Sequence, residues 1–234
     1  MQLRLVGDIK YHLLPGTNRK TTDIVIERDG TIAVRPPISM SPEQVDETVF
    51  SKRIWIYRNL ASWNDLNTQC VKREWVNGET FPYLGSNYRL SLMEHQAEPL
   101  VLKNGRFCLL KEMVASGPQA CHDAFERFYT QKGFDHISKR VTFFSKKIGV
   151  KPGKVLVKNL GFRWATCQAK GDFYFHWKAL MAPLSVIDYI VVHELCHLHH
   201  RDHSDAFWNE VDKVLPNYRE RKEWLRVRGS GLTL

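Results

Sequence analysis

Two histidines and a glutamate lie close together in the stretch His193-Glu194-Leu195-Cys196-His197. On an α-helix, residues four positions apart share one face, so both imidazoles can reach a single metal ion. Glu194 then lies about 100° around the helix axis, beside the open coordination position of the metal. The pattern predicts a zinc site in which His193 and His197 are ligands and Glu194 is the general base.

A third ligand must come from outside this pattern. The sequence offers His203, and it also offers two glutamates in the segments that follow, Glu210 and Glu220. The residues His200-Arg201-Asp202 tolerate a left-handed backbone better than β-branched residues do, so the chain can double back there. We therefore favour His203 over either glutamate, and we expect His199 and His200 to face solvent.

Such a site predicts a hydrolytic reaction. Zinc with three protein ligands keeps one position for water and lowers the pKa of that water from about 15.7 to about 7. Glu194 can take the proton and pass it to the departing amine. A second donor for the oxyanion is needed, and Arg163 and Tyr218 are the candidates. Nitrogen and oxygen ligands of this kind also accept other divalent ions.

The site needs a buried helix and the elements around it. Apolar residues in the segment 186–198 occur on too many sides for a surface helix, and Ser185 is its candidate N-cap. Further helices are expected from Ser204 to about Pro216 and from Tyr218 to Arg228. Strand patterns precede the buried helix at 154–157, 163–167 and 172–177, and the last is a candidate edge strand that could pair with an extended peptide.

The first two thirds of the chain alternate between strands and helices. Hairpin signals stand at Asp29-Gly30 and Asn104-Gly105. Ser41 and Pro42 begin an amphipathic helix with a capping-box glutamine, Gln44, and with apolar positions that continue to Trp63. Two later helices are expected at 119–132 and 136–148, closed by Gly133 and Gly149.

Composition restricts the expected location and partners of the protein. No stretch approaches the roughly 18 apolar residues of a membrane span, and the first ten residues lack the apolar core of a signal peptide, so we expect a soluble cytoplasmic protein. The five cysteines form no CxxC pair, which predicts neither a disulfide framework nor a cysteine zinc site. The net charge of +9 suits an anionic partner and raises the possibility of nucleic-acid association.

Residues in the last third also resemble a known family. The resemblance is carried by these segments: Arg163–Cys167, His176-Trp177, Val186–His197, His203-Ser204 and Phe207-Trp208. They resemble the YgjP-like metallopeptidases, relatives of the SprT-like and WLM zincins. In this chain Ala165-Thr166 replaces the usual Gly-Ser of that family, and His176 replaces the usual Asn before tryptophan.

The resemblance implies an α+β fold of the zincin type in one unit spanning 1–234. A β-rich N-terminal part, 1–116, would precede a helical part, 117–234, that carries the HExxH helix. The resemblance also implies that His203 completes the zinc site and that the reaction is peptide hydrolysis.

Three functions are therefore expected in order of preference. The first is a zinc metallopeptidase acting on a peptide or protein. The second is a metal-dependent nucleotide phosphohydrolase that releases pyrophosphate from nucleoside triphosphates, which the positive charge also suits. The third is a DNA-associated protease of the SprT-like kind, although the sequence shows no recognisable DNA-reading module.

Overall fold

The fold comes from a computed structural model that describes residues 1–234 except 1, 19–20, 27–29, 68–72 and 162, with the side chains of 62–67 also outside the description. The contacts divide the chain into two compact units, Met1–Gln69 and Cys70–Leu234. This division lies well before the expected boundary at 116/117, so residues 73–116 belong to the unit that carries His193. The prediction that 1–234 acts as one functional unit stays a prediction.

The first unit contains a four-stranded sheet of order β1-β2-β4-β3. Its strands are β1 (Gln2–Val6), β2 (Ile9–Leu13), β3 (Asp23–Ile26) and β4 (Ile32–Arg35). β3 and β4 pair antiparallel, as the first hairpin signal predicts. Asp29 of that signal lies outside the described residues. One face of the sheet buries Tyr11 and Val34 in a core that it shares with the helices that follow.

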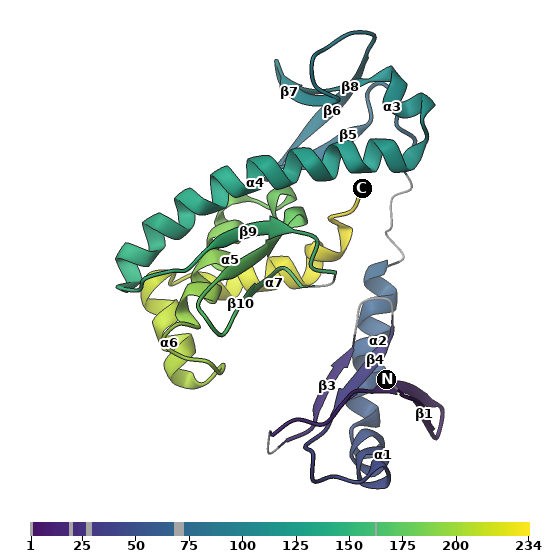
Figure 1. The fold of residues 1–234 in the computed structure, drawn as a ribbon, viewed down its shortest axis with the longest axis vertical. Coiled ribbons are helices and arrows are strands. Elements are labelled where there is room, and N and C mark those ends of the chain that lie inside the picture. The colour runs from purple at the N-terminus through teal and green to yellow at the C-terminus, as the bar shows by residue number, and fades with distance from the viewer. Residues whose placement is uncertain (1, 19–20, 27–29, 68–72, 162) are drawn as a thin grey trace. The chain divides into compact units, whose positions relative to one another are not determined.

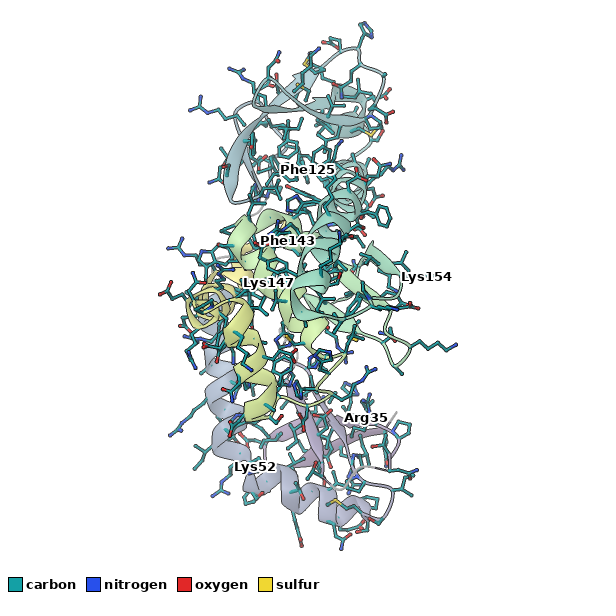
Figure 2. The ribbon with its side chains drawn as sticks, turned by 90° about the vertical axis from the view of Figure 1, so that its left-hand side faces the viewer. Arg35, Lys52, Phe125, Phe143, Lys147 and Lys154 are labelled. Atoms are coloured by element: carbon teal, nitrogen blue, oxygen red, sulfur yellow. The ribbon has the colours of Figure 1, made fainter. Side chains whose placement is uncertain are left out.

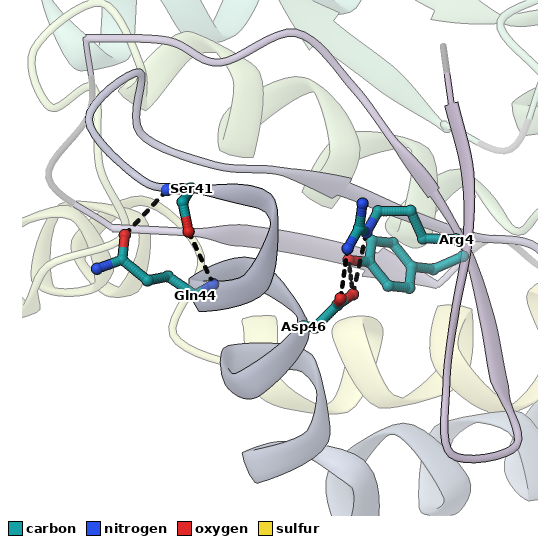
Figure 3. Close-up of polar contacts among 5 residues, drawn as sticks. Arg4, Ser41, Gln44 and Asp46 are labelled. Carbon is teal, nitrogen blue, oxygen red and sulfur yellow. Dashed lines mark hydrogen bonds and ion pairs between the residues drawn. The ribbon is translucent and has the colours of Figure 1, made fainter.

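Two helices follow this sheet, α1 (Pro42–Ser51) and α2 (Arg53–Asn67). The predicted capping box is present, because the Gln44 backbone N–H donates to Ser41 Oγ and the Ser41 N–H donates to Gln44 Oε1 (Figure 3). The single helix expected to run on to Trp63 is wrong, since Lys52 leaves the helical conformation, and Figure 2 labels it where α1 meets α2. Both helices still bury apolar side chains against the sheet.

Asp46 of α1 ties this helix to the sheet (Figure 3). Its carboxylate accepts hydrogen bonds from the Arg4 guanidinium and from the Tyr11 hydroxyl, the latter at 2.6 Å. The hydrogen bond and charge of Arg4 hold the pKa of Asp46 below its usual value, and the Tyr11 hydroxyl acts in the same direction against the opposing effect of burial. The ionised carboxylate is therefore part of the folded first unit.

The second unit begins with a sheet of order β5-β6-β8-β7. Its strands are β5 (Thr80–Tyr83), β6 (Ser86–Met93), β7 (Leu100–Lys103) and β8 (Arg106–Leu110), and a short helix, α3 (Lys111–Ala115), follows. The second hairpin is confirmed, with left-handed φ values of 51° at Asn104 and 70° at Gly105. Rings of Phe81 and Phe107 pack against Phe125 of the next helix, a residue labelled in Figure 2.

One long helix, α4 (Pro118–Ile148), replaces the two helices expected at 119–132 and 136–148. It contacts strands of both sheets of the second unit and the helix that carries His193 (Figure 1). Gly133 does not end a helix: a Cβ added there would lie 2.8 Å from Leu180 Cδ2, so the glycine permits close packing. Gly149 does close the helix, with φ of 84°.

A three-stranded sheet lies next to the metal-ligand region of the sequence. Its strands, in the order β10-β11-β9, are β9 (Val155–Lys158), β10 (Ala165–Cys167) and β11 (Phe173–His176). β11 pairs with β10 antiparallel and with β9 parallel. The prediction that segment 172–177 is an edge strand is therefore wrong, because this strand is central and β10 is one of the two edges.

The remaining elements are helical. A 3₁₀ turn, η1 (Trp177–Met181), leads to α5 (Leu184–Cys196), which is followed by α6 (Asp205–Val214), α7 (Tyr218–Arg228) and a final 3₁₀ turn, η2 (Gly229–Gly231). α5 is buried on most sides as predicted, although its N-cap is Pro183 rather than Ser185. The Arg140 guanidinium of α4 donates two hydrogen bonds to the Asp188 carboxylate of α5. Among the described residues, no helix is long and apolar enough to cross a membrane.

Candidate metal centre

His193, His197 and His203 converge in the second unit. Their ring nitrogens available as ligands all lie within 4.8 Å of one another, and the Nε2 atoms of His193 and His203 are 3.1 Å apart. His193 lies in the last turn of α5, and His197 caps the C-terminus of that helix. His203 lies in the loop before α6. The structure thus brings together the three residues that the sequence singles out.

The loop after α5 turns back toward the helix, although none of His200, Arg201 and Asp202 takes the left-handed backbone expected of them. The Arg201 guanidinium donates to the carbonyls of Gln168 and Ala169, at 3.3 and 3.1 Å. Asp202 Oδ1 accepts the Ser204 backbone N–H at 3.3 Å at the start of α6. These contacts fix both ends of the turn and leave His203 facing His193.

The protonation of the imidazoles suits metal binding. A carbonyl oxygen only accepts, so the 3.0 Å contact between His197 Nδ1 and the His200 carbonyl requires the proton on Nδ1 and leaves the Nε2 lone pair free. Burial lowers the pKa of His193 to about 3, and burial also lowers the pKa of His203. Neutral imidazole is the form that ligates a metal.

The distance between His193 and His203 also fits zinc. Two nitrogens bound at about 2.0–2.1 Å in a tetrahedral site lie roughly 3.3 Å apart. The observed 3.1 Å between the Nε2 atoms of His193 and His203 is close to that value. Three nitrogen donors with a fourth position open are the donor set of a catalytic zinc site. The residues present therefore fit the ion.

Two aromatic residues of α6, Phe207 and Trp208, pack against the imidazoles. The Phe207 side chain is fully buried, and its ring centroid lies 5.0, 4.7 and 4.9 Å from those of His193, His197 and His203. The neighbouring Trp208 ring stacks on His203 at 5.7 Å. Phe207 had no predicted role, and the available signal was its place four residues after His203.

Glu194 lies beside β10. It is 7% exposed, and burial raises the pKa of its carboxyl to about 7, while a hydrogen bond with the Cys167 backbone acts in the opposite direction.

Tyr189, one turn before His193 on α5, also lies beside the triad and was not predicted from the sequence. Its ring lies 5.8 Å from that of His193, and its pKa is raised to about 12, mainly by burial and further by the nearby Tyr218 and Glu194. The i, i+4 spacing from His193 was the signal for it.

Comparison with known families decides the class to which this geometry belongs. A family model described as YgjP-like, metallopeptidase domain, matches residues 20–228. The chain belongs to the YgjP-like metallopeptidase family. Membership supports a metal-dependent peptidase, and therefore a hydrolase, at the level of the family.

Two further comparisons give less information about the class of the protein. The crystal structure of the metallopeptidase zymogen of Pyrococcus abyssi abylysin is 26% identical, over 38% of this chain and 90% of that chain, with a TM-score of 0.36. No curated protein matches the chain.

Glu210, weighed as a third ligand, has a different place. It lies 2.6 Å from His199 Nδ1 through Oε1 and 3.1 Å from His200 Nε2 through Oε2. The carboxylate therefore holds these two partly exposed histidines rather than joining the triad. Glu220, the other carboxylate that was weighed, is exposed on α7.

The two candidate oxyanion donors differ in position. Tyr218 begins α7, is 5% exposed, and stacks on Trp208 at 5.3 Å, so one indole separates it from His203. Arg163 is exposed just before β10. None of the contacts among the described residues joins the Arg163 side chain to the three histidines.

His176, Cys167 and Cys196 make contacts that stabilise the fold and lie outside the histidine triad. His176 Nδ1 accepts the Lys178 backbone N–H at 3.1 Å and caps η1, a task that the asparagine usual in the family can also perform. Burial lowers the pKa of His176 to about 4.

Cys196 is fully buried on α5, and Cys167 contacts the Arg201 guanidinium at 3.8 Å. Neither thiol belongs to the cluster of potential ligands.

Proposed function

We propose that the chain is a zinc-dependent metallopeptidase in which His193, His197 and His203 hold one zinc ion and Glu194 is the general base. The observation that carries the proposal is the convergence of the three imidazoles next to Glu194, which lies on the same helix as His193. A zincin-type arrangement, with the HExxH motif on a buried helix, is part of this proposal. Family membership supports the peptidase class.

The residues divide the chemistry between them. Bound at the three histidines, the ion would polarise a peptide carbonyl and acidify a water molecule. Glu194 would take a proton from that water and deliver it to the departing amide nitrogen. Its contact with the Cys167 backbone orients the carboxylate, and the His200 carbonyl orients His197.

The substrate proposed is an extended peptide or protein segment. β10 is an edge of its sheet and leads to Cys167, which contacts Glu194. A peptide that paired with the free side of β10 would place its backbone beside the general base. This gives β10 the role that the sequence suggested for segment 172–177.

The test is peptide cleavage by the zinc-loaded full chain and by Glu194→Gln. Loss of a general acid–base group reduces turnover by roughly 100- to 10,000-fold. We expect that loss in Glu194→Gln with zinc content unchanged, and normal cleavage by Glu220→Gln, which changes an exposed carboxylate on α7. Cleavage that persists in Glu194→Gln would contradict the proposal.

A nucleotide phosphohydrolase is the second candidate, because the net charge of +9 favours anionic substrates. The same proteins would be assayed for phosphate or pyrophosphate release from a panel of nucleoside triphosphates. Release that depends on Glu194, in the absence of peptide cleavage, would replace the first proposal with this one.

A further inference from the structure

A hollow lies between α6 and α7, next to the histidine triad. Six residues line its volume of about 380 Å³: Trp208, Tyr218, Arg219, Lys222, Glu223 and Arg226. Trp208 belongs to both places, since its ring stacks on His203 at 5.7 Å and on Tyr218 at 5.3 Å. The hollow therefore shares one wall, Trp208, with the metal centre.

Two of the three cations of the hollow already have carboxylate partners. Arg226 donates two hydrogen bonds to Glu223, and Arg219 donates to Asp212 at 3.2 Å. Lys222 forms no ion pair among the residues that the structure describes, and its Nζ lies 4.1 Å from the Trp208 ring centroid. Lys222 therefore lies over the same indole that stacks on His203.

The aromatic walls do not favour a cationic guest. An aromatic face attracts cations, but Lys222 already covers Trp208 and Arg219 lies over Tyr218, with its guanidinium carbon 4.7 Å from the ring centroid. A second positive group would meet these like charges. A carboxylate would instead gain the ammonium of Lys222, which has no carboxylate partner within the described part of the chain.

We propose that this hollow is a specificity subsite that binds an acidic side chain of the peptide substrate close to the cleaved bond, with Lys222 as its cation. The inference rests on the proposed peptidase function and deepens it. Trp208 and Tyr218 form the walls, and Arg219 and Arg226, each paired with a carboxylate, lie at the rim. The subsite selects substrates and takes no part in bond cleavage.

Cleavage profiling with a peptide library tests this inference. Wild type is expected to select Asp or Glu at one position near the cleaved bond. For a peptide with Glu there and a twin with Gln, kcat/KM should differ by about tenfold, the size of one charge-assisted contact. Lys222→Met should bring this Glu-to-Gln ratio close to one, and Lys222→Glu should transfer the preference to Lys or Arg.

The matched control is Lys213→Met, which removes a lysine from a different hollow, lined also by His199 and Glu210. It should keep the wild-type ratio, and zinc content is measured in every variant. Cleavage without an acidic preference, or a ratio that survives Lys222→Met, overturns the subsite and leaves the peptidase intact. Absence of any peptide cleavage by zinc-loaded wild type overturns both, and nucleotide hydrolysis that depends on Lys222 would assign the hollow to phosphate.

Discussion

At the scale of single residues, the orientation of His197 depends on a carbonyl rather than on a side chain. The His200 carbonyl accepts from His197 Nδ1, so the position of His200 determines where the ligand nitrogen of His197 points. The neighbouring His199 is hydrogen-bonded to Glu210 of α6, whose second carboxylate oxygen lies 3.1 Å from His200 Nε2. Glu210 is therefore a positioning residue two steps removed from the ion.

This chain of contacts predicts the effect of Glu210→Ala. Loss of the carboxylate frees His199 and His200, lets the His200 carbonyl move, and should weaken zinc binding by about tenfold, the lower end for outer-shell changes. Competition with a chromophoric chelator measures the affinity. Glu220→Ala is the control and should bind zinc like wild type. Equal affinities of the two variants would show that Glu210 does not act on the site.

Residues of the site differ in how far sequence could predict them. His193, Glu194 and His197 were accessible because their geometry depends only on the helix repeat. His203 needed a turn, which the sequence suggested through a left-handed backbone that none of His200, Arg201 and Asp202 adopts. Phe207 and the role of Glu210 depend on how α6 packs against α5, a long-range contact that leaves no fixed spacing in the sequence.

At the scale of elements, α4 is the support against which α5 and two sheets pack. Gly133 lies at its closest approach, since an added Cβ would be 2.8 Å from Leu180 Cδ2 and 3.2 Å from Val157 Cγ1. Leu180 is fully buried in η1. The glycine therefore determines how near the helix comes to the chain segment that leads into α5.

Enlarging this position should destabilise the second unit. Gly133→Leu would force a buried side chain against Leu180 and Val157, at a cost of about 1–3 kcal/mol that exceeds the roughly 1 kcal/mol gained in helix propensity. Denaturant unfolding measures the free energy. Lys132→Leu, on the exposed neighbouring residue, should change it little. A Gly133→Leu protein as stable as wild type would contradict the close packing.

Elements were predictable where the signal is local. The capping box at Ser41, the turn at Asn104-Gly105 and the helix end at Gly149 all rest on short-range chemistry. Gly133 was predicted wrongly as the end of a helix, because the sequence does not distinguish a glycine needed for close packing from a glycine at a C-cap. The strand order β10-β11-β9 could not be predicted either, since the strand that lies at an edge is determined by pairing between distant segments.

At the scale of the whole molecule, the chain contains two hydrophobic cores. One is formed by β1–β4 with α1 and α2, and the other by the unit that holds the histidine triad. Ligands stabilise only the structure that binds them. Zinc should therefore raise the stability of 70–234, while the first unit responds to other conditions.

Acid should weaken the first unit through Asp46. The pKa of this carboxyl is below its usual value when folded, so its stabilising contribution is complete above the unfolded pKa of about 3.9 and is lost as pH falls through the folded value. Hydrogen exchange of the full chain between about pH 6 and 2.5 measures each unit separately, with intrinsic exchange rates corrected for pH. We expect Asp46→Asn to lower protection of 2–67 at pH 6 and to flatten its decline with acid, whereas Glu47→Gln, on the exposed next residue, keeps the wild-type profile. The Arg4 and Tyr11 contacts would not explain the stability of this unit if Asp46→Asn lost protection as steeply as wild type.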